Sequence, residues 1–342
     1  MNVVATDSLD RWDQYVRSRP DANVGLRPEW RGVLEGTYGL RAHYLEAVEH
    51  GRCVGVLPLY EQRTILGRKV LISIPYCSYG GLLADTNEGG AALIAMAEEL
   101  GRRMGARYIE LKQLEPSGQG LETRTENTTV LCRLDGDEHE HLMQLRKKTR
   151  ERVRQCLREE GLTIRLGPQC LPGFFSLYVR RVHEMGVPSH AFALFASAQS
   201  AFGDDMWVAL VEWQGQPVAA GVYLVWHGTC ASIWTTGMRR AGRSAPGYRL
   251  YWGVMQHARQ HGLDCFRMGR SQKGSTLLDF KRQWGGEVVD LPYEYVALRG
   301  RIPDGAQVIT RGQRLAMSVW RALPAPLARA LGPYACRRIP VW

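Results

Sequence analysis

The chain has 342 residues, of which 45% are apolar and 23% charged, and it carries a formal net charge of +10. This length exceeds what one hydrophobic core usually holds, so we expect two domains, and the composition excludes a disordered chain. Eight cysteines without a C-x-x-C pair exclude a disulfide framework and indicate free thiols in a reducing compartment. The first residues lack a basic and apolar leader, and no stretch is apolar enough to span a bilayer, so a soluble, cytoplasmic protein is expected.

The first predicted elements form a pattern that returns later in the chain. Residues 47–60 and 210–225 each have the pattern of a β-hairpin, in which a Gly turn joins strands with alternating Val. A predicted helix and a further strand follow each hairpin, within residues 87–114 and 245–269. The repetition of this order predicts a duplicated α/β unit, with sheets of similar strand order in the two halves.

Two segments hold most of the excess positive charge. Residues 141–158 form a predicted helix with seven Lys or Arg side chains against one acid, and residues 299–342 hold eight arginines against Asp304. Such charge attracts nucleic acid, phosphorylated substrates or an anionic membrane, although a solvated helix face has the same pattern. In the tail, apolar residues from Leu315 to Leu331 recur at helical spacing. They predict helices over 307–332 that pack on the body and present arginines to solvent or to an anionic membrane.

The stretch "CFRMGRSQKGSTLLDFKRQWGG", residues 265–286, resembles a phosphate-binding loop at the end of a strand. The pattern G-x-x-x-x-G-K-[ST] fails by one residue, because Lys273 precedes Gly274 and Ser275 occupies the lysine position. The backbone N–H groups of this turn could still hold an anion before the next helix, or the turn could be an ordinary one with Ser275 as N-cap. The residues expected to position a substrate or acyl donor here are Gly269, Arg270, Ser271, Lys273, Gly274 and Ser275.

Taken together, these segments resemble the FemAB family of peptidyltransferases, in which two halves with the GNAT acyltransferase fold are joined by a basic helix. The resemblance is strongest to FemAB-related proteins that accompany PEP-CTERM and exosortase systems near exopolysaccharide gene clusters. The similar motifs are "LPLY…YGG" (57–60 and 79–81), "GRS…GS…FK..WG" (269–285), "L.Y.Y" (291–295) and the tail "VWRALPAPLARALGPYACRRIP" (319–340).

The resemblance implies an α/β fold with two tandem GNAT-like domains, each a mixed sheet flanked by helices. The expected segments are an N-terminal half (1–135), a basic helical linker (136–165), a C-terminal half (166–298) and a basic helical tail (299–342). It also implies an acyl or aminoacyl transferase that forms an amide on an amino group of a cell-envelope or exopolysaccharide precursor. An anionic precursor is therefore the expected acceptor.

The family's Phe-Lys dipeptide corresponds to Phe280 and Lys281, which the resemblance assigns to catalysis. An ammonium group beside the reacting carbonyl would stabilise the tetrahedral oxyanion. This role does not require a lowered pKa, although a neighbouring cation such as Arg270 is expected to lower the pKa of Lys281 somewhat. We expect replacement of Lys281 to change stability little, as for an exposed lysine. The alternative is a helix that packs through Leu277, Leu278 and Trp284 and exposes Lys281 to water.

Further residues follow from the same resemblance. Tyr79, Gly80 and Gly81 correspond to a turn that lines the substrate groove in relatives, although Tyr-Gly-Gly also forms plain turns. An aminoacyl-tRNA donor would be held by phosphate contacts from the basic helix, although this helix has no interleaved aromatic side chains to stack bases. The candidate residues on that helix are Lys148, Arg150 and Arg154.

The competing donor is an acyl-coenzyme A. The segment "RRAGRS", 239–244, nearly matches the GNAT pyrophosphate loop through Arg239, Gly242, Arg243 and Ser244. Ser244 stands where Gly or Ala would let the backbone approach the phosphates, and Pro246 removes an N–H group. An acyl-coenzyme A-dependent N-acetyltransferase is therefore one alternative, and a non-catalytic anion-binding assembly factor of polysaccharide machinery is another.

No metal site or nucleophile pattern is recognised. The pairs His139 with His141 and His257 with His261 lack a third ligand and are expected on the solvated surface. The sequence has no G-x-S-x-G motif, so direct attack by the acceptor amine is the simplest mechanism. We expect no metal, no tightly bound cofactor and no DNA partner, and a cytoplasmic location that includes peripheral contact with the inner face of the inner membrane.

Overall fold

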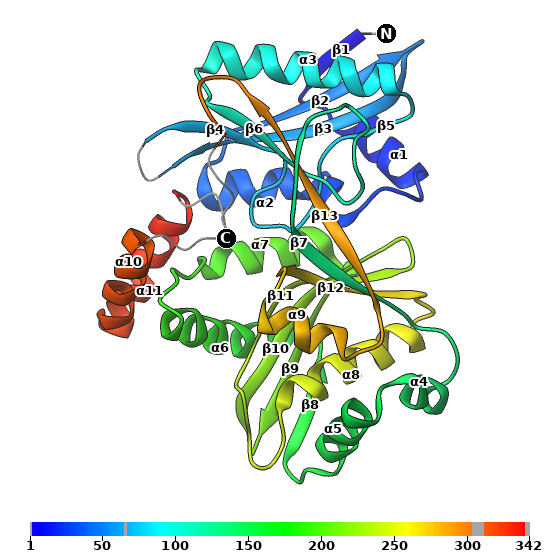
Figure 1. The fold of residues 1–342 in the computed structure, drawn as a ribbon, viewed down its shortest axis with the longest axis vertical. Helices are drawn as coiled ribbons and strands as arrows, with labels where there is room; N and C mark the ends of the chain where they lie inside the picture. Colours follow the sequence, from blue (N-terminus) through cyan, green and yellow to red (C-terminus); the bar gives the residue numbers. More distant parts are fainter. Residues whose placement is uncertain (1, 65–66, 303–310, 339–342) are drawn as a thin grey trace. The chain divides into compact units, whose positions relative to one another are not determined.

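The computed structural model describes residues 2–64, 67–302 and 311–338 (Figure 1). The chain divides into two compact units that are not contiguous in sequence. Unit 1 comprises Met1–Asn127, Asp290–Val308 and Tyr334–Trp342, and unit 2 comprises Thr128–Val289 and Ile309–Pro333. Relative to the segments expected from the sequence, the basic helix falls inside unit 2, and the tail is divided between the units.

Unit 1 is built on a sheet with the strand order β1-β2-β3-β4-β6-β13, and β5 pairs with β3. Helix α3 packs against β1, β2, β3 and β6, where Leu45, Leu57, Leu93 and Ile109 share one core. The elements are β1 (Asn2–Thr6), α1 (Asp10–Ser18), η1 (Val24–Leu26), α2 (Glu29–Tyr38), β2 (Ala42–Glu49), β3 (Arg52–Arg63), β4 (Lys69–Ile72), β5 (Leu83–Ala84), α3 (Asn87–Met104), β6 (Tyr108–Lys112) and β13 (Glu287–Ala297).

Unit 2 has the strand order β7-β12-β11-β10-β9-β8. The first strands and helices of this part of the chain are β7 (Glu122–Arg133), α4 (Glu138–Gln144), α5 (Lys147–Arg158), β8 (Leu162–Leu166), η2 (Pro168–Cys170), α6 (Leu171–Glu184), α7 (Phe192–Phe202) and η3 (Gly203–Asp205). The later ones are β9 (Met206–Trp213), β10 (Gln216–Trp226), β11 (Thr229–Gly237), α8 (Pro246–Gln260), β12 (Cys265–Gln272), α9 (Thr276–Arg282), α10 (Arg311–Ala322) and α11 (Ala325–Cys336).

The two sheets confirm the predicted duplication. Strand, two helices, three antiparallel strands, helix and strand follow one another in both units, and in each the helix α3 or α8 leads into a strand that pairs in parallel. The hairpin turns at His50–Gly51 and Gln214–Gly215 both use positive φ at two successive residues, which suits a tight two-residue turn. The last strand of each sheet is exchanged. Strand β7, which follows the β6 strand of unit 1 in the chain, belongs to the unit 2 sheet, and β13, which follows the elements of unit 2, belongs to the unit 1 sheet.

Helices α6 and α8 cover opposite faces of the unit 2 sheet. Along β9, Ala209 and Val211 join the core that contains α8. Leu210, between them, lies against Gly173 of α6, where an added Cβ would approach its Cδ2 to 2.5 Å. Because successive side chains of a strand point to opposite faces, this alternation places one helix on each side of the sheet.

The basic segment 141–158 is not one helix. Helix α4 ends at Gln144, and α5 begins at Lys147 after Arg146, whose backbone is not helical. Thr149, Val153 and Cys156 turn inward at helical spacing. The basic side chains of α5 therefore lie on its other faces.

The tail forms the predicted helices α10 and α11, which pack on α6 and expose Arg314 and Arg321 as expected, but the apolar residues on which the prediction rested do not make this contact. Leu315, Val319, Leu327 and Leu331 are exposed, whereas Ala328 is buried. The part of the predicted range at 307–310 lies outside the described residues. Small groups, and not the leucine side chains, make the close contact between these helices and the rest of unit 2. An added Cβ on Gly186 would lie 2.3 Å from the backbone oxygen of Met317, and one on Gly332 would lie 2.6 Å from Ser189 Oγ.

Candidate active site

Strands β11 and β12 of unit 2 separate after a short parallel ladder. Their paired register joins Thr229–Ala231 to Cys265–Arg267, although both strands continue for several residues beyond it. On its other edge β11 has a β-bulge, because Val222 of β10 pairs with Trp234 and Tyr223 pairs with Ser232. Bulges often occur next to active sites, where they redirect side chains and end pairing. The separation of β11 and β12 therefore marks a candidate site inside one unit.

Two buried hydroxyl groups belong to strands of this sheet. Tyr223 is fully buried, and its hydroxyl has no hydrogen-bond partner among the described residues; the same holds for Oγ of Ser271 on β12. Burial raises the pKa of Tyr223, so its hydroxyl stays protonated. Gly269 of β12 lies close to Ser232, since an added Cβ would come within 2.7 Å of the Ser232 backbone oxygen. Unpaired buried hydroxyls are uncommon and suit a polar substrate group.

Lys281, on α9, is the charged group at this site. Its side chain is 2% exposed, and its Nζ donates hydrogen bonds to the backbone oxygens of Gly269 and Arg270, the latter at 3.2 Å. Burial, followed by the charge of Arg270, lowers the pKa of Lys281 to about 7. The expectation of an exposed lysine is therefore wrong, because α9 folds back on β12 and turns this side chain inward.

The two hydrogen bonds of Lys281 leave one N–H of its ammonium group available for a substrate. An ammonium group has three N–H donors, and two are used by the carbonyls of Gly269 and Arg270. The charged form can therefore donate its third N–H to an oxyanion, and the neutral form has a lone pair that can accept a proton. With a pKa of about 7, both forms are populated near neutral pH.

Phe280 orients α9 by packing. Its ring contacts Tyr248, Tyr251 and Trp284, with centroid distances of 5.2, 5.5 and 6.3 Å. Leu277, which was expected to pack, is exposed instead. Phe280 thus supports the helix that carries Lys281.

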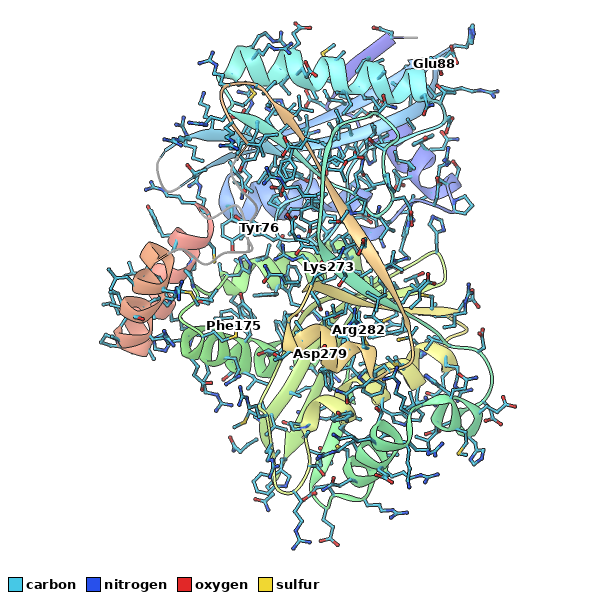
Figure 2. The ribbon with its side chains drawn as sticks, in the orientation of Figure 1. Tyr76, Glu88, Phe175, Lys273, Asp279 and Arg282 are labelled. Carbon is cyan, nitrogen blue, oxygen red and sulfur yellow. The ribbon has the colours of Figure 1, made fainter. Side chains whose placement is uncertain are left out.

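The turn before α9 has the geometry of an ordinary helix start. Ser275 is the N-cap, since its side chain accepts a hydrogen bond from the backbone N–H of Leu278 at 3.2 Å, and Gly274 has a φ of 74°. Lys273 is exposed, as are Asp279 and Arg282 on α9 (Figure 2). The structure brings residues 269–275 together with Phe280 and Lys281 around β12 and α9.

The segment 239–244 has the position of a pyrophosphate loop, between β11 and α8, but a carboxylate already occupies it. Glu159 accepts hydrogen bonds from Ser244 Oγ at 2.8 Å and from the backbone N–H of Arg243 at 3.4 Å. The backbone N–H of Ser244 donates to Ala241 at 3.1 Å, and Ser244 is buried. Gly242 is exposed with a φ of 58°. The sequence search missed Glu159, which directly follows the basic segment as the first of two glutamates.

This arrangement predicts that the negative charge of Glu159 weakens the binding of an anionic ligand at the loop. Replacement by Gln keeps the size of the side chain and removes its charge, so affinity for coenzyme A should rise by about tenfold or more if the loop can bind a pyrophosphate. Isothermal calorimetry on the wild type and Glu159→Gln measures this. Glu160→Gln, at the exposed neighbour, is the matched control. Equal affinity in wild type and Glu159→Gln would show that coenzyme A does not use this loop.

Helix α5 presents a cationic surface next to this loop. Lys148 and Arg154 are exposed, and none of the ion pairs among the described residues involves a basic side chain of α5. Arg150 differs, because its guanidinium donates to the backbone oxygen of Met143 at 3.1 Å and so joins α4 to α5. A depression of about 480 Å³ is lined by Arg154, Arg158 and Arg243 together with Glu151 and Glu159. Arg239 is exposed in the same loop.

The turn at Tyr79, Gly80 and Gly81 belongs to unit 1 and is closely packed. Gly80 has a φ of 147°, and an added Cβ on Gly81 would lie 2.3 Å from Oε1 of Gln113. Tyr79 is buried. These glycines are therefore explained by packing.

Sequence reasoning missed a buried polar cluster beside that turn. Lys112 and Glu294 are almost fully buried in unit 1. Lys112 Nζ donates to the backbone oxygen of Cys77 at 3.4 Å, and Gln113 Nε2 donates to Glu294 at 3.4 Å. No local signal distinguishes these residues from the polar face of a strand.

The histidine pairs do not form a metal site. His141 is buried, contrary to expectation, because its ring packs on Trp252 at 5.2 Å and Nδ1 lies 3.2 Å from Gln256 Nε2. His257 and His261 pack on Trp207. Within residues 2–64, 67–302 and 311–338, no group of three or more potential ligands is placed to hold a metal ion.

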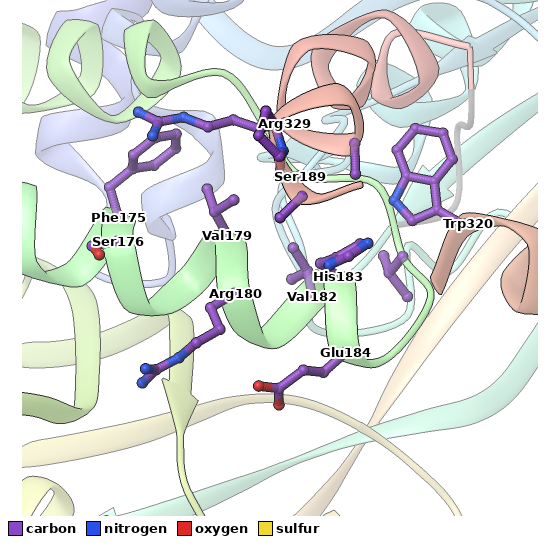
Figure 3. Close-up of a pocket in the computed structure, with 14 residues that line it drawn as sticks. Phe175, Ser176, Val179, Arg180, Val182, His183, Glu184, Ser189, Trp320 and Arg329 are labelled. Atoms are coloured by element: carbon purple, nitrogen blue, oxygen red, sulfur yellow. The ribbon is translucent and has the colours of Figure 1, made fainter. Parts of the chain in front are cut away.

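A separate cavity of about 680 Å³ lies between α6 and the pair α10 and α11 (Figure 3). Val179, Val182, Val187 and Trp320 line it, and the guanidinium of Arg329 stands 5.4 Å from the centroid of the Phe175 ring. The residues described above around Lys281 do not line this cavity.

Comparisons with known proteins agree with this fold. Residues 143–282 match a family model described as an acetyltransferase (GNAT) domain, a span that ends just after Lys281. The structure of FemX is similar, with 15% identity, a TM-score of 0.67 and coverage of 87% of this chain and 98% of FemX. No curated protein sequence matches the chain.

Two further structures have the same arrangement. A tandem GNAT protein from the clavulanic acid biosynthesis pathway is 12% identical, with a TM-score of 0.59 and coverage of 88% and 99% of the two chains. The C-terminal domain of a putative lysylphosphatidylglycerol synthetase from Agrobacterium fabrum is 16% identical, with a TM-score of 0.55 and coverage of 85% and 92%.

The fold and the matched domain define the class. The chain has a tandem GNAT-like fold, and residues 143–282 form a GNAT-like domain of the acyltransferase type. Among the described residues, no helix has the length and apolar character needed to cross a bilayer.

Proposed function

We propose that the protein is an aminoacyl or acyl transferase that forms an amide on an amino group of an anionic cell-envelope or exopolysaccharide precursor. Its nearest functional analogy is the FemAB type, including the forms associated with PEP-CTERM and exosortase systems. The observation that carries this proposal is the buried Lys281, held on the carbonyls of Gly269 and Arg270 where β11 and β12 separate.

In the proposed reaction the acceptor amine attacks the carbonyl carbon of an ester-linked acyl group. A C–N bond forms, the ester C–O bond breaks, and the leaving hydroxyl takes up the proton that the amine releases. The Lys281 ammonium donates its remaining N–H to the oxyanion of the tetrahedral intermediate, and donors of this kind lower barriers by about 3 to 4 kcal/mol. Ser271 and Tyr223 supply hydroxyls for orientation of the substrate.

Two observations favour aminoacyl-tRNA over coenzyme A as the donor. The Glu159 carboxylate accepts two hydrogen bonds from the loop that would otherwise hold a pyrophosphate. The neighbouring α5 presents basic side chains without acidic partners, a pattern that suits contacts with a phosphate backbone. A coenzyme A thioester is the second candidate, because the matched family model is that of an acetyltransferase domain.

The α5 surface gives a prediction for donor binding. Lys148→Gln with Arg154→Gln should weaken binding of charged tRNA and reduce the slope of log affinity against log salt by about 2, one unit for each lost phosphate contact. Fluorescence anisotropy over a salt series measures the slope. Arg52→Gln with Arg68→Gln, at two exposed positions in unit 1, is the charge-matched control. If the slope of log affinity against log salt fell equally in both double variants, α5 would not be the tRNA-binding surface.

A transfer assay tests the activity. Labelled aminoacyl-tRNA and labelled acetyl-coenzyme A are each offered with nucleotide-sugar precursors that carry a free amine. We expect an amide product from aminoacyl-tRNA that is stable to mild base, unlike the ester donor. Product from acetyl-coenzyme A alone would establish the second candidate. No product from either donor, from a protein that nevertheless binds charged tRNA, would favour the non-catalytic assembly factor.

A further inference from the structure

The exposed face of α10 and α11 has an unusual distribution of side chains. Within unit 2, the exposed fractions are 67% for Leu315, 57% for Val319, 45% for Leu327 and 44% for Leu331. Residues four apart on a helix share one face, so each helix presents an apolar pair to solvent. The side of α11 that packs inward instead carries the small residues Ala328 and Gly332. A helix that served only to close the core would have the opposite arrangement.

Basic side chains border these apolar pairs. On α10, Arg314 and Arg321 are exposed and lie two turns apart on one side of Leu315. The guanidinium of Arg321 donates within the helix, to the backbone oxygen of Met317 at 3.3 Å and to Ser318 Oγ at 3.2 Å. The sequence contains no acidic residue after Asp304. The surface therefore combines apolar and positive groups without local neutralisation.

Within the described part of the chain, the contacts of α10 and α11 lie on their opposite side. The inward groups are Met317, Trp320 and Ala328, and part of the space below them is the cavity of about 680 Å³ against α6 (Figure 3). Trp320 and Phe175 line the cavity, whereas Tyr334 on α11 is 73% exposed. The outward residues thus contribute little to the described packing of unit 2.

We infer that α10 and α11 form a docking surface for an anionic lipid bilayer. Helices that lie in a membrane interface place Leu or Phe below the headgroups and Lys or Arg on the polar side, as α10 does. Leu and Val are under-represented among the residues that dominate protein interfaces, whereas exposed Leu and Val pairs bordered by Arg, with Tyr334 nearby, suit the interface of a bilayer. The arginines favour anionic headgroups over neutral ones. This surface is independent of the transfer reaction proposed above.

Vesicle co-sedimentation of the full chain tests the inference. We expect binding to vesicles that contain phosphatidylglycerol, and at least about tenfold weaker binding to pure phosphatidylcholine. Leu315→Ser with Val319→Ser should reduce binding to the anionic vesicles by about tenfold or more, because the apolar contact is lost. Arg314→Gln with Arg321→Gln should remove most of the preference for anionic lipid.

Matched controls separate this surface from general electrostatic attraction. Leu157→Ser removes a leucine with 43% exposure from the basic helix α5, and Arg52→Gln with Arg68→Gln removes two charges from unit 1. Both should bind vesicles like the wild type. If the α10 variant fails to fold by circular dichroism, Leu327→Ser with Leu331→Ser replaces it.

Three outcomes would overturn the inference. These are no binding to anionic vesicles, equal losses in the controls and the α10 variants, or unchanged binding after loss of the apolar pair. Light scattering adds a fourth. A concentration-dependent dimer that dissociates in Leu315→Ser with Val319→Ser, in a protein without vesicle binding, would assign the face to self-association.

Discussion

Replacement of Lys281 by Met should slow the proposed transfer step by about a hundredfold or more. Met keeps most of the length of the side chain but cannot donate a hydrogen bond to the oxyanion. The position of Nζ, fixed by the carbonyls of Gly269 and Arg270, explains why the loss should appear in the chemical step and not in donor binding. Single-turnover transfer from labelled aminoacyl-tRNA measures the rate, and anisotropy measures binding separately.

The control is Arg282→Met, which removes an exposed charge from the next position of α9. It should transfer at nearly the wild-type rate. If Lys281→Met also kept full activity on a confirmed substrate pair, Lys281 would be a structural residue, and the assembly-factor alternative would gain support.

The pH dependence of the same rate distinguishes two roles for Lys281. Because its pKa is lowered to about 7, the ammonium is lost as pH rises through that value. An oxyanion donor then predicts a rate that falls above pH 7, whereas a general base predicts a rate that rises. The pH–rate profile of the residual activity of Lys281→Met should lack the rise or fall that the titration of Lys281 causes in the wild type. A falling limb in the wild type, absent from the variant, is the result expected for the proposed mechanism.

Much of the fold follows from local sequence signals. The hairpin turns at His50–Gly51 and Gln214–Gly215, and the helix that begins at Pro246, need only neighbouring residues to specify them. Because the same signals recur in both halves, the duplicated strand order was predictable. The exchange of β7 and β13 was not, since strand pairing over long sequence distances leaves no local pattern.

The site was only partly predictable. The Phe-Lys dipeptide made Lys281 a candidate, but helical periodicity placed the side chain in water, because a short helix can turn either face inward. Glu159 is invisible in the sequence, since its partners Arg243 and Ser244 lie more than eighty residues away. In the tail, the apolar spacing predicted the helices but not which face is buried. Small residues such as Gly186 and Gly332 decide that by allowing close approach.

The second large effect concerns stability. Burial lowers the pKa of Lys281 to about 7 in the folded protein, while in the unfolded chain it keeps its ordinary value near 10.5. Between these two values the unfolded chain holds a proton that the folded protein lacks, so folding stability must rise with pH. Below pH 7 both states are protonated, and the cost of burying the charge is fully present. Above the unfolded pKa this cost disappears.

Lys281→Met has no amine to titrate at this position. The difference in unfolding free energy between the wild type and this variant therefore measures the effect of the Lys281 titration. Relative to the variant, the wild type should gain about 2 to 3 kcal/mol of unfolding free energy between pH 7.5 and 9.5, since each pKa unit corresponds to about 1.4 kcal/mol. Urea unfolding at several pH values measures the difference. Lys273→Met, which removes an exposed lysine from the same segment, controls for general charge effects. A wild-type-to-variant difference that stays constant with pH would mean that Lys281 retains its proton in the fold, and the buried amine could then act only as an ammonium.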